Sequence, residues 1–258
     1  MPLRPAAGWG KLDARHDLRT LRSALRMAAT LDPLGPPPEQ STDWTAAVYR
    51  AGQPWGMYLN SEIGDCTCAD SAHAVMIATA NMGKIIVPTD ADVLAMYTAL
   101  TGYDGIPGGP RDKGCYELDV DAYMRSTGLC GVRLEAYGSL DPRNLDHVKW
   151  AIQLFGGVRF GFRLPQSAEQ QFEARQPMTV VPGSPSVGGH DMRGVRYVPG
   201  WILLSTWGGL VWASEEFIAT LADEAHAELF EGWQVPGIDR ATLVRDLAIV
   251  NDEMMVAA

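Results

Sequence analysis

The sequence predicts an α+β chain of two lobes, with a helical lobe followed by a lobe rich in antiparallel strands. Three observations lead to this prediction. Apolar residues recur at three- and four-residue spacing as far as about residue 126. After that point, several stretches alternate apolar and polar residues, as half-buried strands do. The chain has 258 residues, which is enough for two packed lobes with a sizeable core.

Residues 1–38 are expected to form an N-terminal arm, and residues 39–258 are expected to form the folded domain. Within the arm, Leu18–Ala29 permits a short helix, and a cluster of prolines from residue 33 to residue 38 ends it. The domain divides into a helical lobe at 39–130 and a β-rich lobe with C-terminal helices at 131–258. The residues of the arm fit three interpretations: a strap across the domain, a docking arm for protein assembly, or a remnant propeptide.

The helical lobe is expected to contain three main helices. The run of small residues after Cys66 predicts a buried helix of about four turns, because Ala, Met and Ile recur there at helical spacing. A second helix is expected at Ala91–Leu100, with Thr89 or Asp90 as its cap. A third is expected at Tyr116–Ser126, with its apolar residues facing inward.

The β-rich lobe is expected to mix strands with helices. The expected strands are Val132–Tyr137, Gly157–Leu164, Asp191–Val198 and Trp201–Thr206. The expected helices cover residues 141–154, 214–229 and 239–254, and the second of these would leave His226 exposed on an acidic helix. Residues 165–189 are rich in Pro, Gly and Ser, and such a long irregular segment often lines a site.

The composition excludes several classes of partner. The net charge is −10, so no nucleic-acid partner is expected, because a phosphate backbone is held by a basic face. No apolar run approaches the roughly 18 residues of a membrane-spanning helix, and the charged N-terminus is not a secretory signal. A cytoplasmic protein is therefore expected, or a virion protein if the gene is carried by a phage. The preference for Arg over Lys fits a bacterial or phage origin.

The four cysteines are too few for a disulfide scaffold in a chain of this size. Free thiols in a reducing cytosol are the main expectation, with a Cys115–Cys130 disulfide as the alternative. Cys66, Cys68 and His73 lack the paired spacing of a zinc site, so we expect no metal and no cofactor.

Cys66 is the first candidate for chemistry, because it stands where a loop becomes the buried helix. A thiol at a helix start is close to the positive end of the helix dipole, which favours the reactive thiolate. Asn60 lies six residues earlier and can curl back toward the sulfur. A free cysteine is more often a small buried hydrophobe, and that interpretation stays open beside the nucleophile. His73 lies further along the same helix and is interpreted as a core or groove histidine.

A second polar cluster follows at residues 187–191, Val-Gly-Gly-His-Asp. His190 begins a predicted strand after two glycines, so its imidazole can face the opposite lobe. A cysteine at a helix start and such a histidine make a nucleophile and a base. A polar side chain about fifteen residues later, at Ser205 or Thr206, would fix the imidazole tautomer.

These stretches resemble papain-like cysteine peptidases. The family has an amide residue six positions before its nucleophile and a glycine two before it, which Asn60 and Gly64 match. Its Asp-Trp start of the mature domain is similar to Asp43-Trp44, and its Gly-His step is similar to Gly189-His190. Its Trp-x-x-x-Asn-Ser-Trp-Gly stretch looks like residues 201–208. The resemblance covers roughly residues 40–212 and also extends to uncharacterised bacterial and phage proteins.

The resemblance implies a papain-like two-lobe fold and a set of site residues. Cys66 would be the nucleophile, His190 the base and Asn60 part of the oxyanion hole. Gly64, Asp65, Gly189 and Trp207 would line the substrate groove. Three features depart from the family. Asn60 is one methylene shorter than the family's Gln, Thr67 replaces an aromatic residue, and Ser205, with Thr206 beside it, replaces the orienting Asn. Asp65 and Asp70 place negative charge near the sulfur and would raise its pKa.

Two functions follow from these features. The first is a thiol hydrolase with a Cys-His dyad, by resemblance a peptidase acting on a peptide or protein substrate. An acyltransferase or deamidase would use the same dyad. The second is a catalytically inactive papain-like module with a structural or binding role, for example in a phage particle or another assembly, because a fold does not fix a function.

Overall fold

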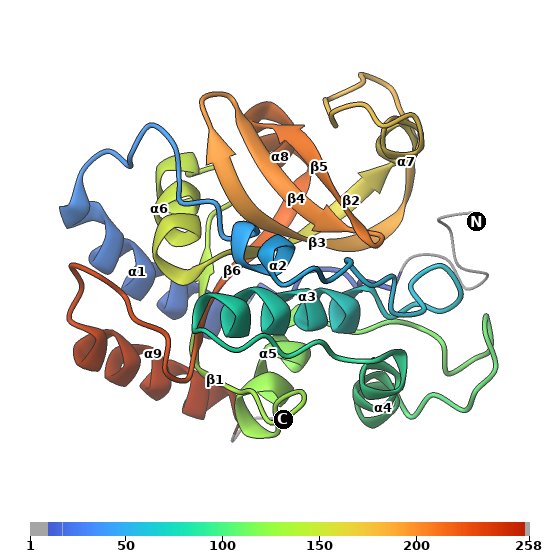
Figure 1. Cartoon of the computed structure of the whole chain (residues 1–258), viewed down its shortest axis with the longest axis horizontal. Helices are drawn as coiled ribbons and strands as arrows, with labels where there is room; N and C mark the ends of the chain where they lie inside the picture. The colour runs from blue at the N-terminus through green and yellow to red at the C-terminus, as the bar shows by residue number, and fades with distance from the viewer. Residues whose placement is uncertain (1–9, 17, 256–258) are drawn as a thin grey trace.

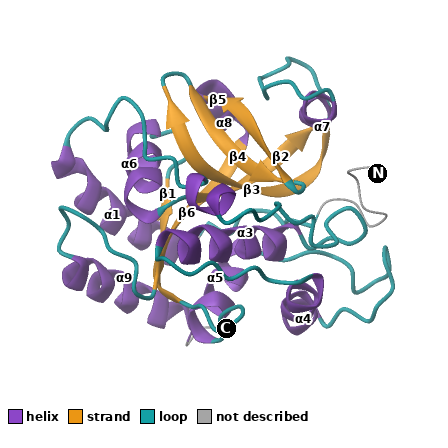
Figure 2. Cartoon of the chain, in the orientation of Figure 1, coloured by secondary structure: helices purple, strands orange, loops and turns teal. Residues whose placement is uncertain are grey.

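The computed structural model describes residues 10–16 and 18–255. Its centre is an antiparallel sheet of six strands in the order β1-β6-β2-β3-β4-β5 (Figure 2). The strands are β1 (Leu134–Leu140), β2 (Val158–Pro165), β3 (Ser186–Val198), β4 (Trp201–Thr206), β5 (Gly209–Ser214) and β6 (Ala222–Phe230). The expected α+β architecture with antiparallel strands after the first helices is therefore confirmed.

Helices pack around this sheet. They are α1 (Leu18–Leu31), α2 (Ala46–Arg50), α3 (Cys66–Asn81), α4 (Asp90–Thr101), α5 (Glu117–Ser126), α6 (Leu145–Phe155), α7 (Gln166–Glu173), α8 (Glu215–Leu221) and α9 (Arg240–Met255), with a short 3-10 helix at Asp32–Leu34. Figure 1 shows strands β2–β5 above α3, with α4 and α5 below it. None of the described helices is long and apolar enough to cross a membrane.

Helix α3 is the central element of the fold. Every residue from Cys66 to Thr79 is buried, and the helix packs against α2, α4, α5 and strand β3. Its many alanines allow these neighbours to approach closely. The prediction of a buried helix that begins at Cys66 is therefore confirmed. The second predicted helix begins as expected too, since Thr89 caps α4 in a capping box with Asp92.

The prediction of a helix over residues 214–229 is wrong in its second half. Helix α8 ends at Leu221, and residues 222–230 form β6, which lies between β1 and β2. Ala and Glu favour a helix by themselves, but two neighbouring strands satisfy the backbone of this segment instead. His226 is consequently buried rather than exposed. The irregular segment expected at 165–189 is also shorter, because α7 and the start of β3 lie within it.

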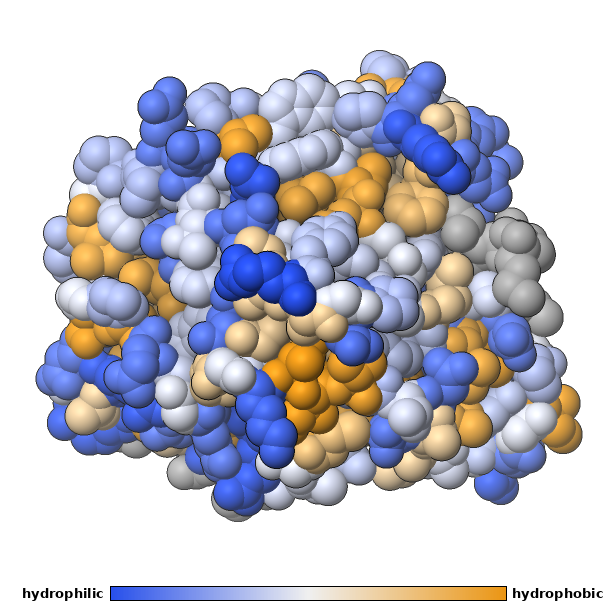
Figure 3. All heavy atoms as spheres, viewed as in Figure 1, coloured by the Kyte–Doolittle hydropathy of each residue, from blue (hydrophilic) through white to orange (hydrophobic). Residues whose placement is uncertain are grey.

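The N-terminal segment is part of the packed structure. The helix expected at Leu18–Ala29 is α1, which packs against β1 and α9 and buries Met27 and Leu31. Before it, Gly10 and Lys11 pass between the first turn of α3 and strand β3, as their hydrogen bonds show below. The molecular surface in Figure 3 mixes polar and apolar residues, and side chains fill the space that the ribbon leaves between α3 and the sheet.

Candidate active site

Cys66 occupies the first turn of α3, and its sulfur is buried against two other segments. The backbone N–H groups of Asp191 and Gly10 face it and favour its charged form, which by itself would lower the pKa of the thiol. Burial raises the pKa of the thiol well above its ordinary value, and the carboxylates of Asp191 and Asp65 raise it further. The two N–H donors oppose this effect without cancelling it. In this conformation Cys66 is therefore a neutral thiol.

His190 lies on β3, directly before the residue whose N–H contacts the Cys66 sulfur. Its Nε2 atom is 2.8 Å from Thr206 Oγ1, and its ring stacks on Trp207 with 4.5 Å between the ring centroids. Burial lowers the pKa of His190 to about 3, so the imidazole is neutral. Of the two hydroxyls proposed to orient this histidine, Thr206 is the one that contacts it.

Ser205 holds a different histidine. Its Oγ atom is 2.9 Å from Nδ1 of His73, whose Nε2 atom is 2.9 Å from the carbonyl oxygen of Gly56. Trp55 and Tyr58 pack edgewise and tilted against the His73 ring. Burial lowers the pKa of His73 to about 4. His73 thus lies in the core beside the site, with both ring nitrogens hydrogen-bonded.

The buried His73 is expected to make the protein acid-sensitive. The unfolded chain takes up this proton near pH 6.5, whereas the folded chain does so only near pH 4. The contribution of the neutral His73 to the free energy of unfolding is therefore complete above pH 6.5, and it falls by up to about 3 kcal/mol as the pH drops to 4. Urea denaturation between pH 7 and 4 measures the free energy of unfolding of wild type and His73→Gln, and this free energy should fall less steeply with pH in the variant.

His16→Gln, at an exposed position, is the control, and its free energy of unfolding should follow the wild-type pH dependence. An equal pH dependence in wild type and His73→Gln would contradict the acid sensitivity assigned to His73.

A small cavity lies beside the sulfur. Its lining includes His73 and five of the predicted site residues, which are Asn60, Cys66, Ser205, Thr206 and Trp207. The cavity measures about 10 Å³, which is room for no more than about one water molecule. A peptide therefore cannot reach Cys66 in this conformation.

The N-terminal arm closes the site. The Lys11 N–H donates to the carbonyl oxygen of Gly189 at 3.1 Å, and the Cys115 N–H donates to the Gly10 carbonyl at 2.8 Å. Gly10 lies so close to Gly64 that an added Cβ would be 1.9 Å from the Gly64 carbonyl oxygen. Two of the four expected groove residues, Gly64 and Gly189, therefore contact the arm.

A third expected groove residue, Asp65, is fully buried before α3, and burial raises its pKa well above the ordinary value.

A cluster of buried charges lies behind the site and was not predicted from the sequence. Arg159 on β2 and Arg193 on β3 are cross-strand partners. Their guanidinium groups contact the carboxylates of Asp70, Asp121, Asp191 and Glu228. Burial alone would raise the pKa of Glu228, but Arg193 and Arg159 outweigh it and lower that pKa to about 2. In the sequence pattern Arg159 alternates with Val158 and Phe160, which predicts an outward side chain, so the pattern did not point to this buried cluster.

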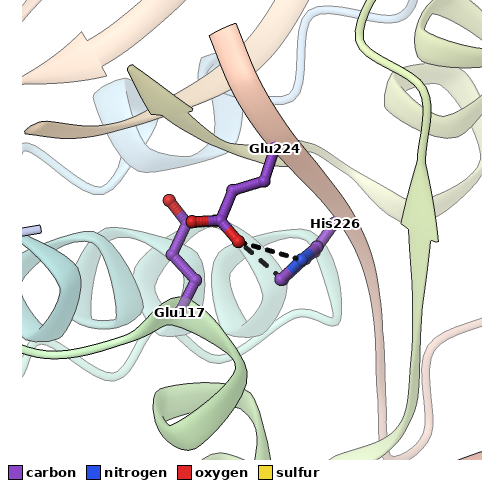
Figure 4. A group of neighbouring side chains, drawn as sticks. All are labelled: Glu117, Glu224 and His226. Atoms are coloured by element: carbon purple, nitrogen blue, oxygen red, sulfur yellow. Dashed lines mark ion pairs between the residues drawn. The ribbon is translucent and has the colours of Figure 1, made fainter. Parts of the chain in front are cut away.

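A second acidic group surrounds the side chain of Lys11. Its Nζ atom is 2.8 Å from Asp223 and 2.9 Å from Glu224. Glu117 from the start of α5 and Glu224 from β6 point toward each other beside His226 (Figure 4). Glu117, Glu224 and His226 each offer one atom of a kind that binds metals, within 4.8 Å of one another. The cation that this group contacts is the Lys11 ammonium.

All four cysteines are free thiols. Cys66, Cys68 and Cys115 are buried and Cys130 is exposed, so the alternative Cys115–Cys130 disulfide is absent.

Comparisons with known proteins identify the fold. No family model matches the sequence, and no curated protein matches it. Among solved structures, the chain is similar to xylellain, a cysteine protease from Xylella fastidiosa, with a TM-score of 0.63 and 17% identity over 88% of this chain and 97% of that one. It is also similar to procathepsin B S9 from Trypanosoma congolense, with a TM-score of 0.57 and 11% identity over 87% of each chain. A Carica candamarcensis cysteine protease matches 74% of this chain and 98% of its own, with a TM-score of 0.51 and 15% identity.

Proposed function

Starting from the papain-like fold of the chain, we propose that it is a thiol peptidase kept latent by its own N-terminal arm. One observation carries the proposal: Gly10 of the arm packs against Gly64, two residues before Cys66, and Lys11 of the arm donates its N–H to the carbonyl oxygen of Gly189, the residue before His190. The arm occupies the position that a substrate backbone would need. Its hydrogen bond to the Gly189 carbonyl is one that the backbone of an extended peptide could also make.

In the proposed reaction the Cys66 sulfur attacks the carbonyl carbon of a peptide bond while its proton passes to His190. The tetrahedral oxyanion is held by the Cys66 N–H and the Asn60 side chain. Collapse of the intermediate breaks the C–N bond, and the leaving amine takes the proton from His190. Water, deprotonated by His190, then hydrolyses the thioester. Thr206 orients the imidazole throughout, in the place of the family's asparagine.

The latent state explains why the thiol is neutral here. With the arm in place, Cys66 is shielded from solvent and faces Asp65 and Asp191. Departure of the arm admits water, which reduces the cost of charging the sulfur. Residues 1–38 thus act as a propeptide in this proposal, which is one of the three interpretations that their sequence allows.

The test is the pH dependence of Cys66 alkylation by iodoacetamide in a Gly10→Ala, Cys130→Ser chain. The first change displaces the arm, and the second removes the exposed thiol that would label as well. Labelling well below the ordinary thiol pKa of about 8.5 is expected, together with a loss of this reactivity in His190→Ala. Turnover of a fluorogenic peptide should require both Cys66 and His190.

Cys68→Ala is the matched control, because Cys68 is a buried thiol two residues along the same helix. It should leave the labelling profile and the turnover unchanged. Labelling that follows an ordinary thiol in the arm-displaced chain would reject the peptidase.

That negative result would favour the second candidate, a papain-like structural or binding module in a phage particle or another assembly. One observation supports this candidate: burial, together with the two carboxylates beside the sulfur, raises the pKa of the Cys66 thiol, whereas a nucleophile needs a lowered one.

A further inference from the structure

We propose that the acid-lined pocket around Lys11 is the specificity pocket of this site and accepts the side chain of a lysine or arginine in a peptide. The pocket is formed by Glu117 of α5, Asp223 and Glu224 of β6 and Gly161 of β2. Lys11 is its occupant while the arm is in place. The inference rests on the proposed function in that the peptide is taken to be a substrate.

The pocket holds the ammonium group by charge and hydrogen bonds. Lys11 is 4% exposed, and its Nζ atom contacts the carboxylates of Asp223 and Glu224 and the carbonyl oxygen of Leu12. Burial by itself would lower the pKa of this lysine, but Glu117, Glu224 and Asp223 outweigh burial and raise it. A buried ammonium group is therefore stable here because three carboxylates from two elements surround it.

Gly161 shapes the wall of the pocket. A Cβ added at this residue would lie 1.9 Å from Cε of Lys11 and 2.5 Å from Oε1 of Glu117. The aliphatic stem of the lysine thus lies directly against the β2 backbone, in space that any larger residue would fill. A glycine at this position is what allows a long side chain to reach the carboxylates.

The pocket holds more acidic side chains than one lysine contacts, and burial together with the neighbouring Glu224 raises the pKa of Glu117 well above its ordinary value. Within the described part of the chain, both carboxylate oxygens of Glu117 are buried and accept no hydrogen bond. His226 faces Glu224 at 3.8 Å and Glu117 at 3.9 Å but is already hydrogen-bonded to Asp121, and the exposed Arg163 approaches Asp223 at 3.8 Å. The Glu117 oxygens that accept no hydrogen bond fit the additional N–H donors of a guanidinium group, so arginine is accepted as well as lysine.

The backbone of the arm at Lys11, whose side chain fills the pocket, lies next to the Cys66 sulfur. The residue before Lys11 has its N–H facing Cys66, and Lys11 itself donates its N–H to the carbonyl oxygen of Gly189, beside His190. A peptide whose basic side chain enters the pocket therefore lies within one residue of the thiol. The occupant is a basic peptide rather than a divalent metal, because the cation that contacts Asp223 and Glu224 belongs to a chain that runs across the site.

The test follows Cys66 labelling by iodoacetamide in the full chain carrying Cys130→Ser. Lys11→Met should accelerate labelling at least about tenfold, because it leaves buried carboxylates without their cation, while Lys11→Arg should stay near the parent rate. Short peptides with lysine or arginine should then slow labelling of the Lys11→Met chain. The same peptides with acetyl-lysine, which has no charge, should not.

Two further variants test the pocket itself. Glu224→Gln in the Lys11→Met chain should remove the preference for charged over acetylated peptides. Gly161→Ala narrows the pocket without changing its charge, and it should accelerate labelling and abolish protection by basic peptides. Equal protection by charged and acetylated peptides would overturn the proposal. The proposal would also be overturned if Zn²⁺ or Mn²⁺ slowed Cys66 labelling while none of the peptides did. The carboxylates and His226 would then be assigned to a metal site.

These measurements do not depend on turnover. Protection of the thiol by a basic peptide succeeds or fails whether or not the chain hydrolyses that peptide. A failure of the specificity pocket and a failure of the peptidase activity are therefore distinguishable.

Discussion

Replacing Arg159 with methionine is expected to lower the free energy of unfolding by about 3–5 kcal/mol at pH 7. Arg159 is fully buried, and its guanidinium group contacts the carboxylates of Asp191 and Glu228 at 2.9 and 3.0 Å. It also donates to the Thr67 carbonyl and the Ser71 hydroxyl on α3. Methionine replaces the aliphatic stem of the arginine but carries no charge, so the substitution leaves the buried carboxylates with Arg193 as their principal cation.

The effect on stability should depend on pH in a defined direction. Without Arg159, the excess carboxylates are repelled by one another in a poorly solvated site, and protonation relieves this repulsion. The stability difference between wild type and Arg159→Met should therefore narrow as the pH falls from 7 toward 4. Urea denaturation at several pH values measures both the loss and its pH dependence.

Arg163→Met is the matched control on the same strand. The Arg163 side chain is 69% exposed, and its ion pairs with Asp13 and Asp223 are 3.5 and 3.8 Å long. Such surface pairs are worth at most about 1 kcal/mol. If Arg159→Met lowered the free energy of unfolding no more than Arg163→Met does, the buried charge cluster would not be what holds α3 against the sheet.

The sequence was sufficient to predict the elements whose pattern is local. The helix that begins at Cys66, the capping of α4 by Thr89 and the hairpin of β3 and β4 follow from helical spacing, a cap residue and a Pro-Gly turn. The strand β6 could not be predicted in this way. Its Ala and Glu residues favour a helix, and only the two strands beside it, β1 and β2, make it a strand.

The candidate site was predicted in part for the same reason. Cys66, Thr206 and Trp207 line one cavity at or next to the ends of elements that sequence patterns locate, and Asn60 reaches it from the loop before α3. The pairing of Ser205 with His73 rather than His190 depends on which way each side chain of β4 points. The contact of Lys11 with Asp223 joins residues 212 positions apart, and no local pattern carries that information.

Displacing the arm is expected to have the second large effect. Gly10→Ala should increase the rate of Cys66 alkylation at least about a hundredfold. The arm keeps the site closed through hydrogen bonds worth about 1 kcal/mol each and a buried ammonium group worth more, and losing these contacts raises the fraction of molecules with an open site. The added methyl group would lie 1.9 Å from the Gly64 carbonyl oxygen, and Gly64 is backbone that cannot turn aside like a flexible side chain. The Gly10 N–H that contacts the sulfur would move away together with the arm.

An independent substitution on the other wall of the site should give the same result. A Cβ at Gly189 would lie 2.2 Å from the Lys11 carbonyl oxygen, so Gly189→Ala displaces the arm from the side of β3. Asp13→Ala, at an exposed position of the arm, is the control and should label at the wild-type rate. Rates are compared by mass spectrometry of the Cys66 peptide in the Cys130→Ser background. If both glycine variants labelled as slowly as wild type, residues 10–12 would not be what closes the site, and access to Cys66 would be limited by the packing of α3 against β3 and β4.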